Sequence, residues 1–146
     1  MHHHLLLRVI TKLLCGMIIL FAFYVQFHGD FSPGGGFQAG VIMAVAFILY
    51  GVVFGIDNAK LVCPPWLVHK LMALGVIVYA GTGIFSMILG FDFLDYGAFK
   101  PDHQSHGQHW GILAVELGVG ITVTGVMISV YFAFATRQPG IKDEEW

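Results

Sequence analysis

The chain alternates long apolar blocks with short polar segments. The four apolar blocks cover residues 5–27, 37–56, 67–89 and 110–135. Each block is close to the roughly 20 residues that an α-helix needs to cross the hydrocarbon core of a bilayer. The pattern therefore predicts an all-α integral membrane protein, a single membrane domain of four transmembrane helices.

Composition supports this prediction and excludes several other classes of protein. Of the 146 residues, 57% are hydrophobic and only 11% are charged, which is too apolar for an ordinary soluble domain. Formal net charge is -2 and there is no basic run, so we predict no nucleic-acid binding. Cys15 and Cys63 form no CxxC pair, which argues against a disulfide framework and a thiolate metal site.

The N-terminal block has features of both a membrane helix and a targeting segment. It is preceded by basic residues, but it continues through several aromatic residues without a small-x-small cleavage pattern. We therefore interpret it as a retained helix. The run His2-His3-His4 is either native or an appended tag, and no functional inference is based on it.

The distribution of Lys and Arg predicts the orientation. Six of the seven basic residues fall on one side of the four predicted helices: Arg8, Lys12, Lys60, Lys70, Arg137 and Lys142. Only Lys100 falls on the other side. Because basic residues are retained on the cytoplasmic side, we expect both termini to be cytoplasmic and the first and third loops to face outward.

Small residues recur at helical spacing in two of the predicted helices, which predicts close helix packing. The second helix carries a stripe of Gly36, Gly40, Ala44, Gly51 and Gly55. The fourth carries one seam of Gly111, Gly118, Thr122, Gly125 and Ser129, and on its opposite face a line of Glu116, Gly120 and Thr124. Two packed faces suit a subunit wedged between neighbours. The alternative is that glycine is simply common in membrane helices.

The segment from Phe31 to Gly40 is the most unusual part of the chain, because Pro33, Gly34, Gly35 and Gly36 lead directly into an apolar helix at Phe37. Exposed N–H groups at such a helix start could hold an anion or carbonyls of another subunit. The other reading is a tight re-entry turn that lets the helix dock closely. No Lys-Ser or Lys-Thr follows, so it is not a nucleotide-binding loop.

Glu116 is the ionisable residue placed well inside a predicted helix. A carboxyl group at that depth is costly and typically faces a cavity, a partner or a proton path. It is our candidate for an ion path, as a proton relay or as part of a cation route. The alternative is a structural hydrogen bond to a neighbouring helix.

His103, His106 and His109 form an HxxHxxH run in the third loop. Such spacing suits a metal site only if the segment is helical. Gly107 and the surrounding Ser and Gln residues favour a solvated loop, so we predict no metal site and no cofactor. The sequence carries no Ser-His-Asp pattern or paired carboxylates, which argues against an enzyme acting by itself.

Two segments resemble a known family. The stretch 32–40, SPGGGFQAG, resembles the PGGGFxxG segment of the B subunit of Mrp-type sodium/proton antiporters, the MnhB-like family. The stretch 111–123, GILAVELGVGITV, is similar to the last-helix segment of that family, with Glu116 before a run that contains Gly118 and Gly120. The likeness covers nearly the whole chain, although the long His-rich third loop departs from the family pattern.

The resemblance implies an accessory but required membrane subunit of a multisubunit monovalent cation/proton antiporter. Na⁺ and H⁺ would be the transported ions, and large subunits related to those of respiratory complex I would carry the main channels. The expected location is a bacterial or archaeal cell (inner) membrane. Two alternatives stay open: a subunit of an energy-converting hydrogenase-like or complex-I-like assembly, and an independent channel or metal-handling protein that uses the outer histidines.

Overall fold

The computed structural model describes residues 2–29, 34–99 and 104–137. Within these ranges the elements are α1 (His2–Phe27), α2 (Gly36–Phe54), α3 (Ile56–Val62), α4 (Pro65–Ile88), the 3₁₀ helix η1 (Tyr96–Phe99) and α5 (Gln104–Ala135). Helices α1, α2, α4 and α5 are long and apolar enough to cross a membrane. The prediction of an all-α protein with four transmembrane helices is confirmed.

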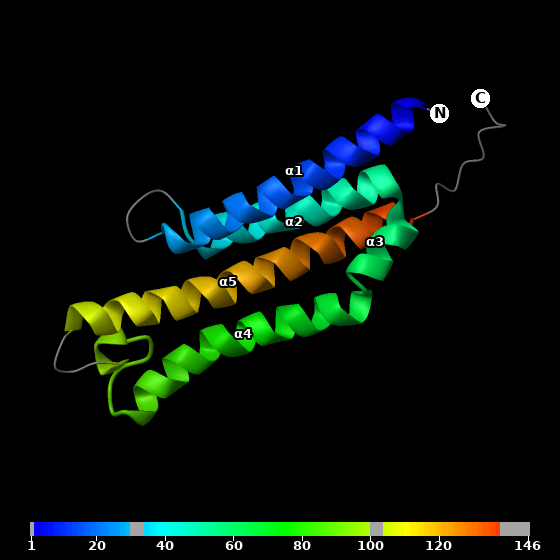
Figure 1. Ribbon diagram of the computed structural model, residues 1–146. Coiled ribbons are helices and arrows are strands. Elements are labelled where there is room, and N and C mark those ends of the chain that lie inside the picture. Colours follow the sequence, from blue (N-terminus) through cyan, green and yellow to red (C-terminus); the bar gives the residue numbers. More distant parts are fainter. Residues whose placement is uncertain (1, 30–33, 100–103, 138–146) are drawn as a thin grey trace.

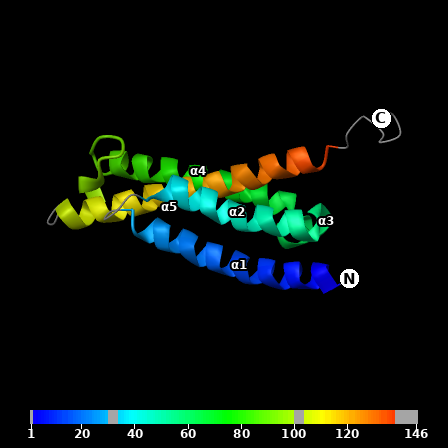
Figure 2. The same cartoon turned by 90° about the horizontal axis from the view of Figure 1, so that it is seen from above.

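The long helices form a row in which neighbours in space are not neighbours in sequence (Figure 1). The spatial order is α1, α2, α5, α4, so the C-terminal helix lies between the second and the third long helices. The view turned by 90° shows α1 and α4 on opposite sides of the central pair α2 and α5 (Figure 2). The row places the start of α2 directly against the first half of α5.

The second loop differs from the predicted one because it contains a short helix. Gly55 has φ 91°, a conformation that side chains disfavour, and it ends α2 at Phe54. The chain then turns into α3 and reaches α4 through the Pro64-Pro65 pair. Gly55 is exposed and a Cβ there would meet nothing within 4 Å. Including Gly55 in the packing stripe of the second helix was therefore wrong.

Helix α5 begins six residues earlier than the predicted start at Trp110, at Gln104. His106 and His109 therefore lie on a helix and not in a loop, which corrects the loop interpretation of this segment, while His103 lies outside the described residues. The physical reason is packing: Gly107 and Gly111 are buried, and the ring of Tyr96 covers Gly111. Tertiary contact thus overrides the weak helix propensity of this Gly- and Ser-containing stretch.

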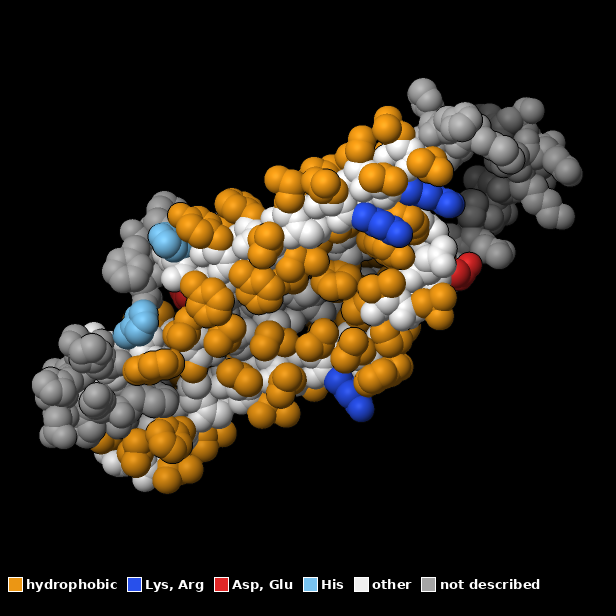
Figure 3. Space-filling view, in the orientation of Figure 1, with side chains coloured by type: hydrophobic (Ala, Val, Ile, Leu, Met, Phe, Trp, Pro, Cys, Tyr) orange, Lys and Arg blue, Asp and Glu red, His pale blue; other side chains and the backbone are white. Residues whose placement is uncertain are grey.

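The surface is mostly apolar, as expected of a chain surrounded by lipid (Figure 3). Leu20, Ile88 and Phe134 are each more than 70% exposed. The buried cluster is small and includes Val68 and Ile128. An exposed apolar surface of this extent requires a bilayer or partner helices.

The described basic residues lie at one end of the molecule, where α1 begins and α5 ends (Figures 1 and 3). Arg8 and Lys12 lie over the ring of Phe54, 5.8 and 5.5 Å from its centroid. Lys60 Nζ donates a hydrogen bond to Thr136 Oγ1 at 3.3 Å. These contacts join α1, α2, α3 and the end of α5 at the same level. Which side of the membrane this end faces stays a prediction.

Candidate functional site

The glycine-rich entry to α2 is a sharp turn that ends in a helix start. Gly35 has φ 115° and ψ 176°, which favours glycine, and Gly36 is the first helical residue. Ala39 N donates to Gly35 O at 3.0 Å, which begins the hydrogen-bond ladder of the helix. Gly35 and Gly36 are buried and Gly34 is half-buried; Pro33 lies outside the described residues.

Glu116 of α5 lies directly against this turn. A Cβ placed on Gly29 would lie 2.7 Å from Glu116 Oε2, and one placed on Gly35 would lie 3.0 Å from Glu116 Oε1. The carboxylate is therefore held between the end of α1 and the start of α2. Because the N-terminus of a helix attracts negative charge, this is a suitable seat for a carboxylate. The structure brings together two features that the sequence presents about 80 residues apart.

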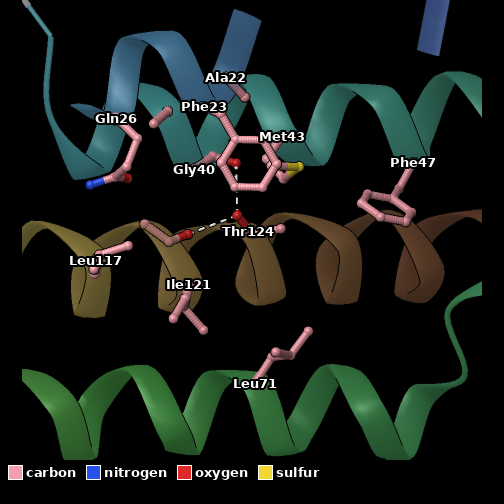
Figure 4. Close-up of a pocket in the computed structure, with 12 residues that line it drawn as sticks. Ala22, Phe23, Gln26, Gly40, Met43, Phe47, Leu71, Leu117, Ile121 and Thr124 are labelled. Atoms are coloured by element: carbon pink, nitrogen blue, oxygen red, sulfur yellow. Dashed lines mark hydrogen bonds between the residues drawn. The ribbon is translucent and has the colours of Figure 1, made fainter. Parts of the chain in front are cut away.

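The backbone of α5 approaches α2 as closely as its side chain does. A Cβ on Gly36 would collide with the backbone carbonyl oxygen of Glu116. One turn further, a Cβ on Gly40 would lie 2.7 Å from Gly120 O. Thr124 then links the two helices, since its hydroxyl lies 3.1 Å from Gly40 O and 2.7 Å from Gly120 O (Figure 4). Gly36, Gly40 and Gly120 thus permit the close contact that seats Glu116.

The opposite face of α5 packs against α4. A Cβ on Gly118 would lie 2.9 Å from both Gly75 O and Tyr79 N, and one on Gly125 would lie 3.2 Å from Val68 O. Both small-residue faces of α5 are therefore covered by helices of the same chain. The two faces are thus accounted for within the chain and give no evidence for or against neighbouring subunits.

Gln26 of α1 is a polar residue at this site that the sequence analysis did not single out. It is only 6% exposed. A Cβ on Gly120 would lie 2.7 Å from Gln26 Oε1, while Gln26 Nε2 has no hydrogen-bond partner in the described part of the chain. The available sequence signal was a glutamine near the end of the apolar second half of α1, but the sequence could not show that this residue is buried.

The remaining sequence candidates lie outside this contact. Phe37 is 60% exposed and lies beside Phe21 and Val25 of α1. His28 stacks on Tyr24 with ring centroids 4.4 Å apart. Among the described residues no group of three or more His, Cys, Asp or Glu could hold a metal ion. His103 of the HxxHxxH run lies outside the described residues, so this result does not include it.

Comparison with known proteins gives a consistent result over most of the chain. Residues 6–129 match a family model described as a domain related to the MnhB subunit of Na⁺/H⁺ antiporter. A protein of Staphylococcus haemolyticus with the provisional name antiporter subunit mnhB2 is 35% identical over 135 residues, which covers 88% of this chain and 92% of the relative. A protein of the same provisional name from Staphylococcus aureus strain Newman is 34% identical over 131 residues, with the same coverage.

Proposed function

The chain belongs to the family of the MnhB subunit of Na⁺/H⁺ antiporters, and on this premise we propose that it is an accessory membrane subunit of a multisubunit antiporter that exchanges Na⁺ for H⁺. Its relatives are named as antiporter subunits, and four of its helices are suited to cross a membrane. The proposed activity is therefore transport by an assembled complex with other membrane subunits, and no catalysis is assigned to this chain alone.

We assign the part that this chain plays in ion movement to Glu116. The observation that carries this proposal is the position of its carboxylate between Gly29 and Gly35, at the start of α2. A carboxyl group inside a membrane helix is costly and tends to be retained for ion or proton movement. Because Gly29 and Gly35 have no side chains, the carboxylate oxygens of Glu116 lie close to the segment that joins α1 to α2.

The contact also explains how the charge of Glu116 would affect the position of α2 relative to α5. Helix α2 attracts the carboxylate through its N-terminal end, so proton or cation binding at Glu116 weakens that attraction. Because Gly36 lies against the backbone of Glu116, a change in this contact shifts α2 relative to α5. In this proposal, Glu116 couples its own ionic state to the docking of the α1–α2 turn.

The test is to replace Glu116 by Gln, which nearly keeps its volume and hydrogen-bonding capacity. We expect the complex to assemble while cation/proton exchange in inverted vesicles falls about a hundredfold or more, the scale expected for losing one positioned proton-transfer group. Glu116→Asp should be milder. The matched control is Asp57→Asn in α3, which makes the same chemical change at an exposed carboxylate outside the membrane-spanning helices.

The outcomes separate the two roles of Glu116 when exchange is normalised to the amount of complex. Full exchange by an intact Gln variant would reduce Glu116 to a structural residue. Loss of assembly with Gln, together with rescue by Asp, would show that it mainly holds α5 to α2. Loss of exchange at normal complex levels supports the proposed coupling.

We also propose that the basic end of the molecule is cytoplasmic, in a bacterial or archaeal inner membrane. Support comes from the common level of Arg8, Lys12 and Lys60 and from the general retention of basic residues on the cytoplasmic side. In this orientation Glu116 and the glycine turn lie toward the outer surface.

A further inference from the structure

Arg8 and Lys12 of α1 converge on one aromatic ring at the basic end of the molecule. The guanidinium carbon of Arg8 and Nζ of Lys12 lie 5.8 and 5.5 Å from the centroid of the Phe54 ring. Both side chains are exposed, and neither forms an ion pair with a carboxylate in the described part of the chain. Like charges four residues apart on a helix repel each other, so the pair is suited to an anion that contacts both cations.

The two cations continue the face of α1 that packs against α2. On this face Cys15 Sγ donates a hydrogen bond to Ala46 O of α2 at 3.2 Å, and Ala22 is buried. Steps of four, three and seven residues keep positions 8, 12, 15 and 22 on one side of the helix. Helix α2 ends at Phe54, so this face becomes basic at the point where its partner helix ends. Figure 3 shows basic side chains side by side at this end, with apolar side chains around them.

The length of α2 indicates the depth of the Phe54 ring in the membrane. Helix α2 has 19 residues, which span about 28 Å at 1.5 Å per residue. This length is close to the roughly 30 Å thickness of the hydrocarbon core. Its last residue therefore lies at the edge of the hydrocarbon, next to the level of the phospholipid phosphates. Long basic side chains such as Arg8 and Lys12 can extend to that level while their stems stay among apolar groups.

Exposed apolar side chains lead from the cations toward the middle of the bilayer. Leu13 directly follows Lys12, and Leu13, Met17 and Leu20 are 63%, 58% and 71% exposed. Steps of four and three residues place them on one stripe of α1. A phospholipid carries an anionic phosphate and apolar chains, so it matches both the cations and the stripe. Free phosphate or an acidic peptide in water would match the cations alone.

Attraction within the chain accounts for one cation at this position but not for the pair. The C-terminal end of a helix attracts a cation, and so does the face of an aromatic ring. Lys70 shows the simple case, because its Nζ alone lies over the ring of Trp66, 4.9 Å from the centroid. A second cation on the ring of Phe54 adds repulsion, which an anion between the two removes.

We propose that Arg8 and Lys12 bind the phosphate of an anionic phospholipid at the end of α2, with an acyl chain along the stripe that begins at Leu13. The planar guanidinium of Arg8 suits two phosphate oxygens, and the ammonium of Lys12 acts as a point charge. The bound lipid links α1 to the end of α2. The inference requires only that the long helices cross a bilayer, and it is independent of Glu116 and of the side that this end faces.

The experiment is local photo-crosslinking in vesicles that contain the assembled complex. A benzophenone amino acid replaces Val9, which follows Arg8 and is 58% exposed. The probes are tagged phosphatidylglycerol and tagged phosphatidylcholine with identical acyl chains. We expect about 25-fold more adduct with phosphatidylglycerol, since each basic residue near an anionic headgroup contributes about 1 kcal/mol, or about fivefold. The same amino acid at Phe27, an exposed position at the opposite end of α1, should show no preference.

Variants of the two cations test the assignment to these residues. Arg8→Gln and Lys12→Gln should each lower the preference for phosphatidylglycerol at position 9 about fivefold, and the double variant should remove it. Arg8→Lys keeps the charge and should keep most of the preference. The matched control is Lys70→Gln, which removes an exposed cation from the ring of Trp66 and should change nothing at position 9.

Several outcomes would overturn the proposal. Equal adducts of both lipids in the wild type would exclude a phosphate site, and a preference that survives in the double variant would reflect general surface charge. Displacement of the phosphatidylglycerol adduct by excess inorganic phosphate would identify a site for free phosphate. Crosslinking to another subunit in place of lipid would identify a protein occupant.

The acidic C-terminal residues Asp143, Glu144 and Glu145 lie outside the described residues, and they are tested by neutralising them. A preference for phosphatidylglycerol that appears only after this change would show that the chain fills the site itself, which would also overturn the proposal. If the Gln variants do not assemble, the comparison of the two lipids on the wild type and on Arg8→Lys still decides.

Discussion

Gly36→Ala is the sharpest test of the contact between α2 and α5, because the added methyl group has nowhere to go. The three nearest atoms to a Cβ at Gly36 are the backbone O, C and Cα of Glu116. No side-chain rotation can relieve that overlap, so the two helices must separate. Overpacking of this kind costs about 3 kcal/mol at the upper end of its usual range. The better helix propensity of Ala offsets up to about 1 kcal/mol, which leaves a loss of about 2 kcal/mol.

A loss of about 2 kcal/mol corresponds to roughly a thirtyfold shift in the unfolding equilibrium. It can be measured by SDS titration of the purified protein and by the amount of complex on native gels. The matched control is Gly81→Ala in α4, where a Cβ would meet nothing within 4 Å; that variant should be neutral or stabilised by up to about 1 kcal/mol. Equal SDS midpoints for the two variants would refute the reasoning.

Three further predictions concern the parts of the chain outside the membrane-spanning helices. A single cysteine at Ser105 should be labelled only from outside and one at Asn58 only from the cytoplasm; the reverse pattern would invert the orientation. Burial, with a smaller effect of a neighbouring tyrosine, raises the pKa of Tyr96, so its stabilising contribution holds below the ordinary pKa of about 10 and is lost as pH rises through the folded value. Absorbance titration should show that Tyr96→Phe removes a phenol that ionises above its ordinary pKa, and an unchanged titration curve at high pH would count against this prediction. Burial also raises the pKa of the Cys63 thiol, so maleimide should label Cys63 more slowly than the exposed Asn58→Cys; equal rates would contradict its burial.

The number and type of the long helices could be predicted because membrane crossing requires about 20 apolar residues, and the sequence shows four such blocks. The short helix α3 could not be, since seven residues give too little periodicity to separate a helix from a loop. The early start of α5 was missed for another reason. It depends on the ring of Tyr96 covering Gly111, a contact between segments that no local pattern reveals.

The individual residues of the candidate site could be predicted from the sequence, but the contact between them could not. Glycines before an apolar helix and a carboxyl group inside one are visible in the sequence. Their meeting depends on the spatial order α1, α2, α5, α4 (Figure 1), and small-residue stripes predict close packing without naming the partner helix. Gln26 was missed because its burial comes from α2 and α5 together.

The glycine segment and Glu116 form one structural feature, because Glu116 lies against both Gly35 and Gly36. Gly35 needs a positive φ to turn the chain into α2. Gly36 has no room for a Cβ because the backbone of Glu116 lies there, and a Cβ on Gly29 would displace the carboxylate of Glu116. The two interpretations of the segment, a docking turn and a helix start that holds an anion, are therefore not alternatives: close docking is what brings a carboxylate to the start of α2. We therefore expect a change in the charge of Glu116 to act on the docking of α2 against α5, and assembly and transport have to be measured on the same variants to test this.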